Sequence, residues 1–181
     1  CTSLESLDLS NFTISSSATV TDMLNFGTEN KIKIFKTPKS IGQEIAITTG
    51  STLFDSSTGE AKTSITTSDA GKVLASSDSG YLFEDWRDNL GNIDTDSLQS
   101  IMFLTTDSLQ SDYSDYSSTG TIFTTGIELY QNGESDIAFV RDGMIYAPRS
   151  CESMFCFPSV VEIVFDNFNT SYTTDMSGMF N

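Results

Sequence analysis

The chain has 181 residues, 38% of them hydrophobic, and carries nine basic against twenty-five acidic side chains, for a net charge of −16. The length and apolar content suffice for one large domain or two small ones. Nucleic acids and anionic membrane surfaces both bind basic side chains, so this acidity argues against either partner. The charge is typical of a surface kept soluble by self-repulsion.

The sequence contains no histidine and three cysteines. The missing histidine removes the commonest general base and the commonest neutral metal ligand. Cys151 and Cys156 could close only a small loop, and whether they are joined stays open. Cys1 stands apart from them, and the spacing matches no zinc pattern. No apolar run approaches the length of a membrane span.

Residues 1–23 predict one solenoid repeat unit. Leu4, Leu7 and Leu9 follow the L-x-x-L-x-L spacing, in which a short strand points alternate side chains into a solenoid core. Asn11 follows at the position where such units turn and use an amide side chain to satisfy backbone groups.

Residues 24–80 predict a small antiparallel β module that covers the end of the preceding solenoid. Lys31–Ile34 and Glu44–Thr48 alternate polar and apolar residues, as half-buried or edge strands do. Pro38 and Gly42 indicate a bend between these two strands. Six of the nine basic residues lie in this region, and all six are lysines.

Residues 81–150 predict an acidic module with one short helix and an antiparallel meander. Leu82, Phe83, Trp86 and Leu90 fall on one face at helical spacing, which predicts a helix within residues 81–97. The strands are expected at Ile101–Leu104, Ile127–Tyr130, Ile137–Val140 and Met144–Tyr146, with tight turns at Asn132-Gly133 and Asp142-Gly143. The Tyr-Asp-Ser stretch at 112–118 predicts a surface loop.

Residues 151–181 predict a second solenoid unit that is related to the first. The pair Met154-Phe155 recurs after twenty-five residues as Met179-Phe180. When residue 1 is placed directly after residue 181, the two ends of the chain align without a gap at the same spacing. In this alignment Val160 falls on Leu4, Ile163 on Leu7, Phe165 on Leu9, Asn167 on Asn11 and Phe168 on Phe12.

These pieces resemble the BspA-like repeats of bacterial surface proteins, the mycoplasma-lipoprotein type with leucine-rich-like units of twenty-five residues. The resembling stretches are 7–12, 20–23, 167–171 and 175–180. The passage from Ile32 to Leu74 is similar to the segment that closes such arrays, and that from Met144 to Phe155 to the lead-in of the next array. The resemblance implies a secreted or wall-attached bacterial adhesin, with no catalytic residues to carry over. The fold expected is mainly β, with solenoid units at both ends that flank antiparallel β modules and one short helix.

A solenoid unit cannot bury its own apolar face, and about three units are normally needed for stability. Each side chain left exposed forgoes roughly 1.5–3 kcal/mol. We therefore expect the tail of one copy to pack on the head of the next, as successive segments of a longer polypeptide or as separate chains in a head-to-tail filament. The predicted stacking interface comprises Leu4, Leu7, Leu9, Asn11, Phe12, Val160, Ile163, Phe165, Asn167, Phe168, Met176, Met179 and Phe180.

Two other functions, catalysis and discrete ligand binding, and one cofactor, calcium, are alternatives to this interpretation. Catalysis has little support, because no nucleophile–base pair can be assembled without histidine. Calcium is a weaker alternative to having no cofactor, because the available carboxylates fit no known calcium loop. These carboxylates are Asp94, Asp96, Asp107, Asp112 and Asp115. A discrete binding domain is the last alternative, in which the module at residues 81–150 presents Tyr113 and Tyr116 to a host or microbial surface protein or to a glycan.

Overall fold

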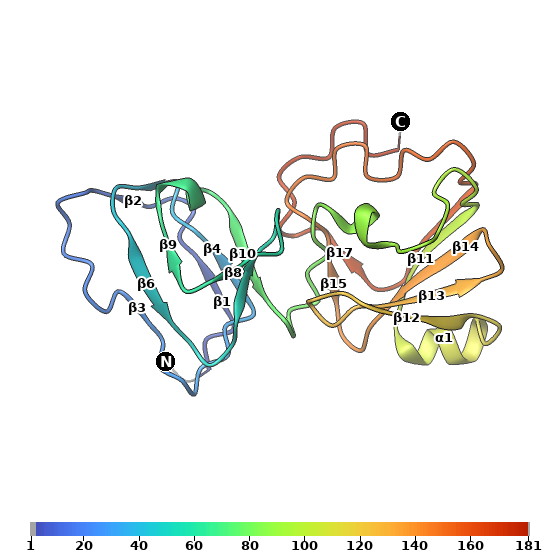
Figure 1. Ribbon diagram of the computed structural model, residues 1–181, viewed down its shortest axis with the longest axis horizontal. Coiled ribbons are helices and arrows are strands. Elements are labelled where there is room, and N and C mark those ends of the chain that lie inside the picture. Colours follow the sequence, from blue (N-terminus) through green and yellow to red (C-terminus); the bar gives the residue numbers. More distant parts are fainter. Residues whose placement is uncertain (1–2, 181) are drawn as a thin grey trace. The chain divides into compact units, whose positions relative to one another are not determined.

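The computed structural model describes residues 3–180 (Figure 1). Within this range it is mainly β, with one α-helix and two 3-10 helices, so the predicted mainly-β class is confirmed. The chain divides into two compact units, Cys1–Ser79 (unit 1) and Gly80–Asn181 (unit 2). No helix within the described part of the chain is long and apolar enough to cross a membrane. Cys1 lies outside the described residues.

Unit 1 begins with a head segment (residues 4–26) that lies alongside a second segment (residues 32–49). Three short parallel ladders join them: β1 (Ser6–Asp8) to β4 (Ile34–Lys36), β2 (Thr13–Ile14) to β5 (Ser40–Ile41), and β3 (Leu24–Asn25) to β6 (Ile45–Thr48). The strand expected at Lys31–Ile34 therefore starts only at its last residue. The strand expected at Glu44–Thr48 is confirmed as β6.

The rest of unit 1 is antiparallel and covers the far side of the second segment. It consists of β7 (Leu53–Asp55), β8 (Ala61–Lys62), β9 (Ser64–Ile65), the 3-10 helix η1 (Thr67–Asp69) and β10 (Val73–Ser76). The main sheet has the order β1-β4-β10-β7-β8, and β9 pairs with β6. The antiparallel strands therefore close one side of the second segment, and β1 is left at the edge of the sheet.

Charged side chains hold these antiparallel strands together. The carboxylates of Asp55 and Asp69 are almost fully buried. Lys72 Nζ lies 2.6 Å from Asp55 Oδ2, and Lys62 Nζ lies 3.1 Å from Asp69 Oδ1. Thr37 donates its hydroxyl to the carbonyl oxygens of Asp69 and Lys72, which ties β4 to the same cluster.

Unit 2 is built around a five-stranded sheet of order β12-β13-β14-β11-β16. Its strands are β11 (Ser100–Leu104), β12 (Ser117–Ile122), β13 (Glu128–Asn132), β14 (Asp136–Val140) and β16 (Glu162–Phe165). β11 runs parallel to both of its neighbours, whereas β12, β13 and β14 are antiparallel. The tight turn expected at Asn132-Gly133 joins β13 to β14, and Gly133 has the positive φ of 64° that such a turn needs.

The short helix expected within residues 81–97 is reduced to a single turn of 3-10 helix. Only Trp86–Asn89 coils, as the 3-10 helix η2. The amide of Leu82 is bonded instead to the carbonyl of Tyr146, 2.8 Å away, so the backbone before η2 belongs to a tertiary contact. Gly91 follows with φ of 70°. Leu82, Trp86 and Leu90 are all buried in the core, so the apolar spacing marked burial but not a helix.

The α-helix of unit 2 is α1 (Thr106–Asp112), capped by the Thr105 hydroxyl, which accepts a hydrogen bond from the amide of Ser108 at 3.1 Å. Its Leu109 packs with Met102, Leu104, Ala138 and Val140 on one face of the sheet. The stretch 112–118, expected to be a surface loop, is the end of this helix, a turn and the start of β12. Tyr113 and Tyr116 are half-buried against the same apolar cluster.

The third strand of the expected meander leaves the sheet. β15 (Ile145–Tyr146) pairs in parallel with β17 (Phe168–Asn169), so a lead-in segment (residues 145–157) lies alongside a tail segment (residues 160–180). The amide of Cys151 donates to Asp175 O, and that of Phe155 donates to Met179 O, both at 2.8 Å. Figure 1 shows these two segments side by side near the C-terminus. The tail segment also contributes β16, which extends the sheet beyond β11.

Candidate functional site

The first open edge, the head surface, is the outer side of the head segment in unit 1. β1, β2 and β3 each pair with a strand of the second segment, and β1 ends its sheet. Leu4, Leu7 and Leu9 are half-buried against the unit 1 core. The side chain of Phe12 is 56% exposed and that of Met23 is 40% exposed, and Asn11 is exposed beside Phe12.

The second open edge, the tail surface, is the outer side of the tail segment in unit 2. β16 ends its sheet, and β17 pairs with β15. The exposed fractions are 42% for Phe165, 48% for Met176 and 64% for Phe180. A hollow of about 400 Å³ opens here, lined by Phe165, Phe168, Thr170, Met176, Met179 and Phe180. This apolar hollow therefore lies at an edge formed by β16 and β17, which run parallel to β11 and β15 respectively.

Aromatic rings in unit 2 stack between neighbouring segments of the chain. Phe155 and Phe180, the two members of the twenty-five-residue recurrence, have ring centroids 5.6 Å apart and planes 20° apart. Phe103 and Phe165 are stacked in the same way, 5.7 Å apart at 4°. The sequence recurrence therefore places equivalent side chains over one another in neighbouring segments.

Asn167 shows how a polar residue is accommodated between such segments. It is buried, and its Nδ2 donates to the carbonyl oxygens of Arg141, at 3.2 Å, and of Gly143. These carbonyls belong to the chain 26 and 24 residues earlier. The amide side chain therefore satisfies backbone acceptors of the preceding strand connection. Asn11, its counterpart in the sequence alignment, is exposed on the head surface.

The structure places the thirteen predicted interface residues in two groups, one on the edge of each unit. Asn167 and Met179 are buried, and Val160, Ile163 and Phe168 are half-buried against the unit 2 core. Two further exposed apolar residues on these surfaces, Val161 and Met23, lie outside the predicted set. Val161 is 85% exposed beside Val160. Met23 belongs to the Asp-Met pair 22–23, which recurs at 175–176 when three extra residues after Phe12 are allowed for. The recurrence of this pair was the available signal for Met23.

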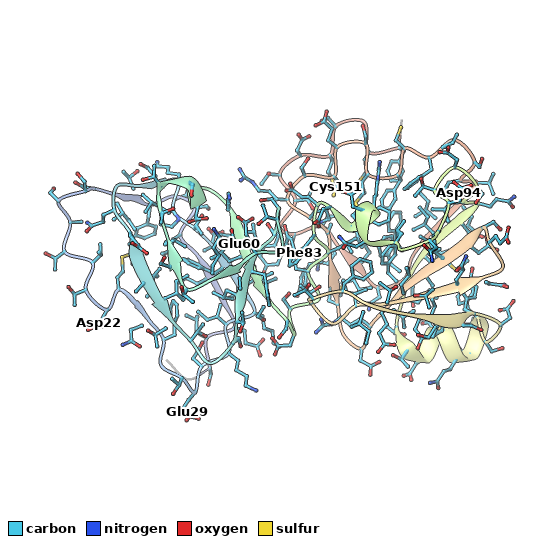
Figure 2. The ribbon with its side chains drawn as sticks, viewed as in Figure 1. Asp22, Glu29, Glu60, Phe83, Asp94 and Cys151 are labelled. Atoms are coloured by element: carbon cyan, nitrogen blue, oxygen red, sulfur yellow. The ribbon has the colours of Figure 1, made fainter. Side chains whose placement is uncertain are left out.

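The two surfaces differ in how their acidic residues are paired. On the head surface, Glu5 lies 3.1 Å from Lys33 and Asp8 lies 3.2 Å from Lys36, each lysine coming from the next segment. Hydrogen bonds from Ser10 hold the pKa of Asp8 below its ordinary value. Asp22 is exposed on the outside of unit 1 (Figure 2).

The acids of the tail surface lie close to serines. Asp175 accepts from the amide and hydroxyl of Ser177, at 2.9 and 2.6 Å, and these bonds hold the pKa of Asp175 below its ordinary value. Asp166 accepts from the Ser108 hydroxyl at 2.5 Å. Glu162 is exposed on β16. The tail surface is therefore acidic around its apolar hollow.

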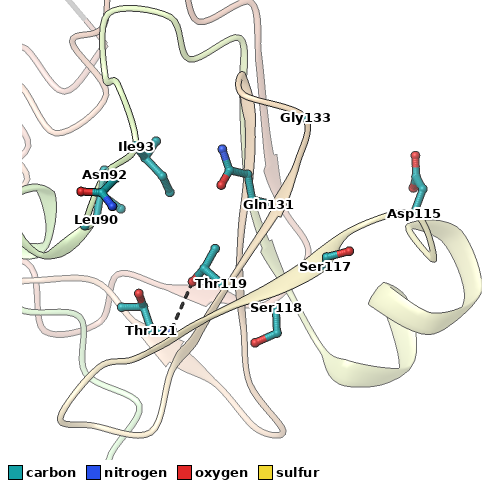
Figure 3. A pocket seen from close by; sticks show the side chains of 11 residues that line it. Leu90, Asn92, Ile93, Asp115, Ser117, Ser118, Thr119, Thr121, Gln131 and Gly133 are labelled. Carbon is teal, nitrogen blue, oxygen red and sulfur yellow. Dashed lines mark hydrogen bonds between the residues drawn. The ribbon is translucent and has the colours of Figure 1, made fainter.

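A polar trough of about 570 Å³ lies elsewhere in unit 2, along β12 (Figure 3). Its lining includes the hydroxyl side chains of Ser117, Thr119 and Thr121 and the amide side chains of Asn92 and Gln131. Figure 3 shows Gln131 pointing from β13 toward Ile93. The trough offers neutral donors and acceptors at a sheet edge.

The tyrosines proposed for partner binding do not stand free in a loop. The rings of Tyr113 and Tyr116 lie edge to face, 6.0 Å apart, and pack toward α1 and the sheet. Burial raises the pKa of Tyr116, whose hydroxyl lies 3.5 Å from Ser100 Oγ. The tyrosine pair therefore contributes to the core under α1.

The carboxylates weighed as calcium ligands make local contacts. Asp94 accepts from the amide of Asp96, Asp115 accepts from the Asn132 side chain at 2.7 Å, and Asp107 lies in the first turn of α1. Within residues 3–180 there is no group of three or more Asp, Glu or Cys side chains placed to hold a metal ion. Cys151 is a buried thiol whose pKa is raised by burial, and Cys156 is exposed.

No protein-family model, no curated protein sequence and no solved structure matches this chain. Its function is therefore inferred from its own residues and geometry.

Proposed function

We propose that this chain is a non-enzymatic structural and adhesive module of a bacterial surface protein. Its ends are solenoid units, and the tail surface of one module stacks on the head surface of the next. The next module is either a following segment of one long polypeptide or a second chain. The observation that carries the proposal is the match between two parallel sheet edges whose apolar residues coincide in a gapless alignment of twenty-five-residue spacing, with Ile163 on Leu7, Phe165 on Leu9 and Phe168 on Phe12.

The contacts within each unit supply the template for the contact between modules. In both units a short strand is followed, 23 to 28 residues later, by another strand that pairs with it in parallel. A head segment added at the tail surface would continue this arrangement, with Leu7 beside Ile163 and Leu9 beside Phe165. The half-buried leucines of the head surface and the hollow of the tail surface would then cover one another.

Energetic magnitudes indicate which form of stacking is strong. Burying a large apolar side chain contributes roughly 1.5–3 kcal/mol. Five such side chains stand on the two surfaces, and each of them is already partly buried: Phe12, Met23, Phe165, Met176 and Phe180. The total is on the order of 5–10 kcal/mol, against roughly 4–15 kcal/mol for the freedom lost when two separate chains associate. Stacking between free chains is therefore weak, and stacking between covalently joined modules is favoured by their high effective concentration.

Unfolding of a tandem protein tests this proposal. Two full chains are fused so that residue 1 of the second copy follows residue 181 of the first. We expect the midpoint of thermal unfolding to rise relative to the single chain, because the two edges bury each other. A tandem protein that carries Met176→Asp only in its first copy should melt like the single chain. The same substitution in the second copy, which lies at a free end, is the matched control. A tandem protein that melts like the single chain in every version contradicts the proposal.

A cell-surface or secreted location and adhesion to host or microbial surfaces belong to the same proposal. They are supported by the resemblance of both ends to bacterial surface repeats and by the net charge of −16. Labelled tandem protein should bind to intact cells or matrix proteins in a saturable manner. Binding that does not saturate would remove the adhesive part of the proposal and leave the structural part.

The polar trough of unit 2 favours a second candidate function, the binding of neutral glycans. Hydroxyl and amide side chains can pair with sugar hydroxyls, and the lining residues include a single charged group, Asp115. Titration of isotope-labelled chain with neutral oligosaccharides should shift the amide resonances of residues 90–93 and 117–121. Gln131→Ala should weaken this effect, and Gln110→Ala on the exposed side of α1 should not. Shifts spread evenly over the surface would contradict a built site.

A further inference from the structure

We propose that Asn11 and Phe12 set the register of the seam between modules. In this arrangement the Asn11 amide donates to the backbone carbonyls of Asp166 and Phe168 in the adjoining tail segment, and the Phe12 ring packs on Phe180. The inference rests on the proposed end-to-end stacking, and it names the atoms that make the stacking specific.

The bonds of Asn167 give the position of the acceptors. Its Nδ2 donates to carbonyls 26 and 24 residues earlier, those of Arg141 and Gly143. In the gapless join of residue 181 to residue 1, Asn11 occupies the equivalent position one repeat later. The carbonyls 26 and 24 residues before it are those of Asp166 and Phe168. Unit 1 contains a bond of the same span, because Asn30 Nδ2 donates to Leu4 O, 26 residues earlier, at 3.2 Å.

The direction of the tail backbone makes the Phe168 carbonyl available. The carbonyls of Asn167 and Asn169 accept from the lead-in segment, from the amides of Ile145 and Ala147. Successive carbonyls of a strand point to opposite sides, so the carbonyl of Phe168 between them points toward the open edge. A neighbouring head segment would approach from this side.

The contact between Phe12 and Phe180 follows from the same alignment, in which residue 1 is placed after residue 181. Phe168 lies 6.3 Å from Phe155, the residue thirteen positions before it, with ring planes 62° apart. The residue thirteen positions before Phe12 in the joined alignment is Phe180. These two rings are among the most exposed large apolar side chains of the described residues, at 56% and 64%. Their mutual burial would remove both from water.

Together the two residues disfavour alternative packings. A slip of one residue would turn the head strands over and carry the leucines away from the hollow. It would also leave the Asn11 amide without the carbonyls that accept from it, and a buried amide without partners is costly. Two heads or two tails meeting would present antiparallel strands with neither contact in place. The pair therefore selects head-to-tail stacking in one register.

Hydrogen exchange in the tandem protein tests the inference, with only the first copy isotope-labelled. In the wild-type tandem, the open-edge amides of residues 162–170 in the first copy should exchange more slowly than in the single chain. Asn11→Asp in the second copy keeps the side-chain volume but removes the donors, and should reduce this extra protection on the order of tenfold. Phe12→Ala in the second copy should also reduce it. The same substitutions in the first copy lie at a free end and should leave the protection unchanged.

The outcomes separate this inference from the proposed function. Absence of extra protection in the wild-type tandem overturns the stacking and the inference together. Extra protection that survives both Asn11→Asp and Phe12→Ala in the second copy overturns the inference and leaves the stacking standing. Single chains with either substitution should unfold like the wild type, because both side chains are exposed in the isolated molecule.

Discussion

Unit 1 and unit 2 place short parallel strands side by side and then close one side of the arrangement, but they do so with different chemistry. Unit 1 carries six lysines against nine acidic residues, and its covering strands are joined by ion pairs between lysines and the buried carboxylates of Asp55 and Asp69. Unit 2 carries three arginines against sixteen acidic residues, and its core is filled by Trp86, Phe103, Phe139 and Phe155. The same pattern of short parallel strands is therefore stabilised by ion pairs in unit 1 and by an aromatic core in unit 2.

The largest effect is expected in the aromatic core of unit 2. The Trp86 ring lies edge to face with Phe139, at 5.1 Å, and with Phe157, at 6.0 Å. Trp86→Ala should destabilise unit 2 by about 3–5 kcal/mol, because a large buried ring leaves a cavity. Amide resonances measured in increasing denaturant should report early unfolding of residues 80–181, with residues 3–79 unchanged. Simultaneous loss of both units would show that they fold as one.

The charged closure of unit 1 should be the next most sensitive. Asp55→Asn leaves Lys72 without its partner at 2.6 Å, and one member of a buried pair without the other is unfavourable. We expect a loss of about 2–3 kcal/mol, below the range for fully buried pairs because the Lys72 side chain is 30% exposed. The same denaturant series should show unit 1 unfolding early and unit 2 unchanged. Glu29→Gln, which removes one charge at an exposed position of the same unit, is the matched control. An equal loss in the two variants would assign the effect to net charge.

Acid should affect the two units unequally. Burial by itself raises the pKa of Asp55 and of Asp69, but hydrogen bonds from Lys72 and Ser57 in one case, and from Thr66 and Lys62 in the other, outweigh burial and lower both values. Because the folded pKa lies below the unfolded one, the stabilisation is present above about pH 4 and is lost as pH falls through the folded values. The midpoint temperature of thermal unfolding of unit 1 should therefore fall once the pH is lowered below about 4. Asp55→Asn should make the unfolding temperature of unit 1 depend less on pH in this range. An unchanged dependence on pH would contradict the role given to the Asp55 carboxylate.

The smallest effect concerns association between free chains. Both surfaces are set in an acidic molecule of net charge −16, so two copies repel one another. Raising ionic strength from about 0.01 to 0.15 M shortens the screening length from about 30 to 8 Å and should increase association. Sedimentation velocity at high protein concentration measures this change. Association that weakens with salt would indicate an interface held by opposite charges.

Much of the strand pattern could be predicted from local sequence. The Asn-Gly turn requires a backbone that few residues adopt, and β11 and β14 read as continuous apolar runs because both faces of their sheet are covered. The recurrence of Met-Phe after twenty-five residues also corresponded to a real stacking of rings. These signals are strong because one residue type is tied to one geometry.

The helices could not be placed in this way, and a repeated hexapeptide shows why. Thr-Asp-Ser-Leu-Gln-Ser occurs at 95–100 and again at 106–111. The second copy forms most of α1, capped by Thr105. The first copy begins in a turn, in which the backbone amide of Ser97 donates to Asp94 O at 3.2 Å, and it does not continue as a helix. The backbone amide of Gln99 is bonded instead to Ser135 O at 2.7 Å, and Ser100 begins β11. Identical local propensity is overridden here by tertiary hydrogen bonds.

The sequence predicted the candidate site as two sets of positions, one at the head and one at the tail of the chain, and the structure adds which of those side chains are exposed. The alignment pairs Asn11 with Asn167, but in the structure the Asn11 amide is exposed, whereas the Asn167 amide is bonded to carbonyls 24 and 26 residues earlier. The polar trough on β12 left no recognisable trace in the sequence, because hydroxyl residues are abundant along the whole chain.

Disulfide trapping across the seam tests the central claim most directly. In the joined alignment Ser6 of one module lies beside Glu162 of the preceding one, and both positions are exposed. The tandem protein, with Cys1 and Cys156 replaced by serine, should carry Glu162→Cys in its first copy and Ser6→Cys in its second. We predict rapid and nearly complete oxidation, since neighbouring parallel strands bring such residues within disulfide range. Pairing Glu162→Cys with Ser10→Cys, four residues out of register, should give little cross-link. Equal and slow oxidation of the two pairs would contradict stacking of the tail surface on the head surface.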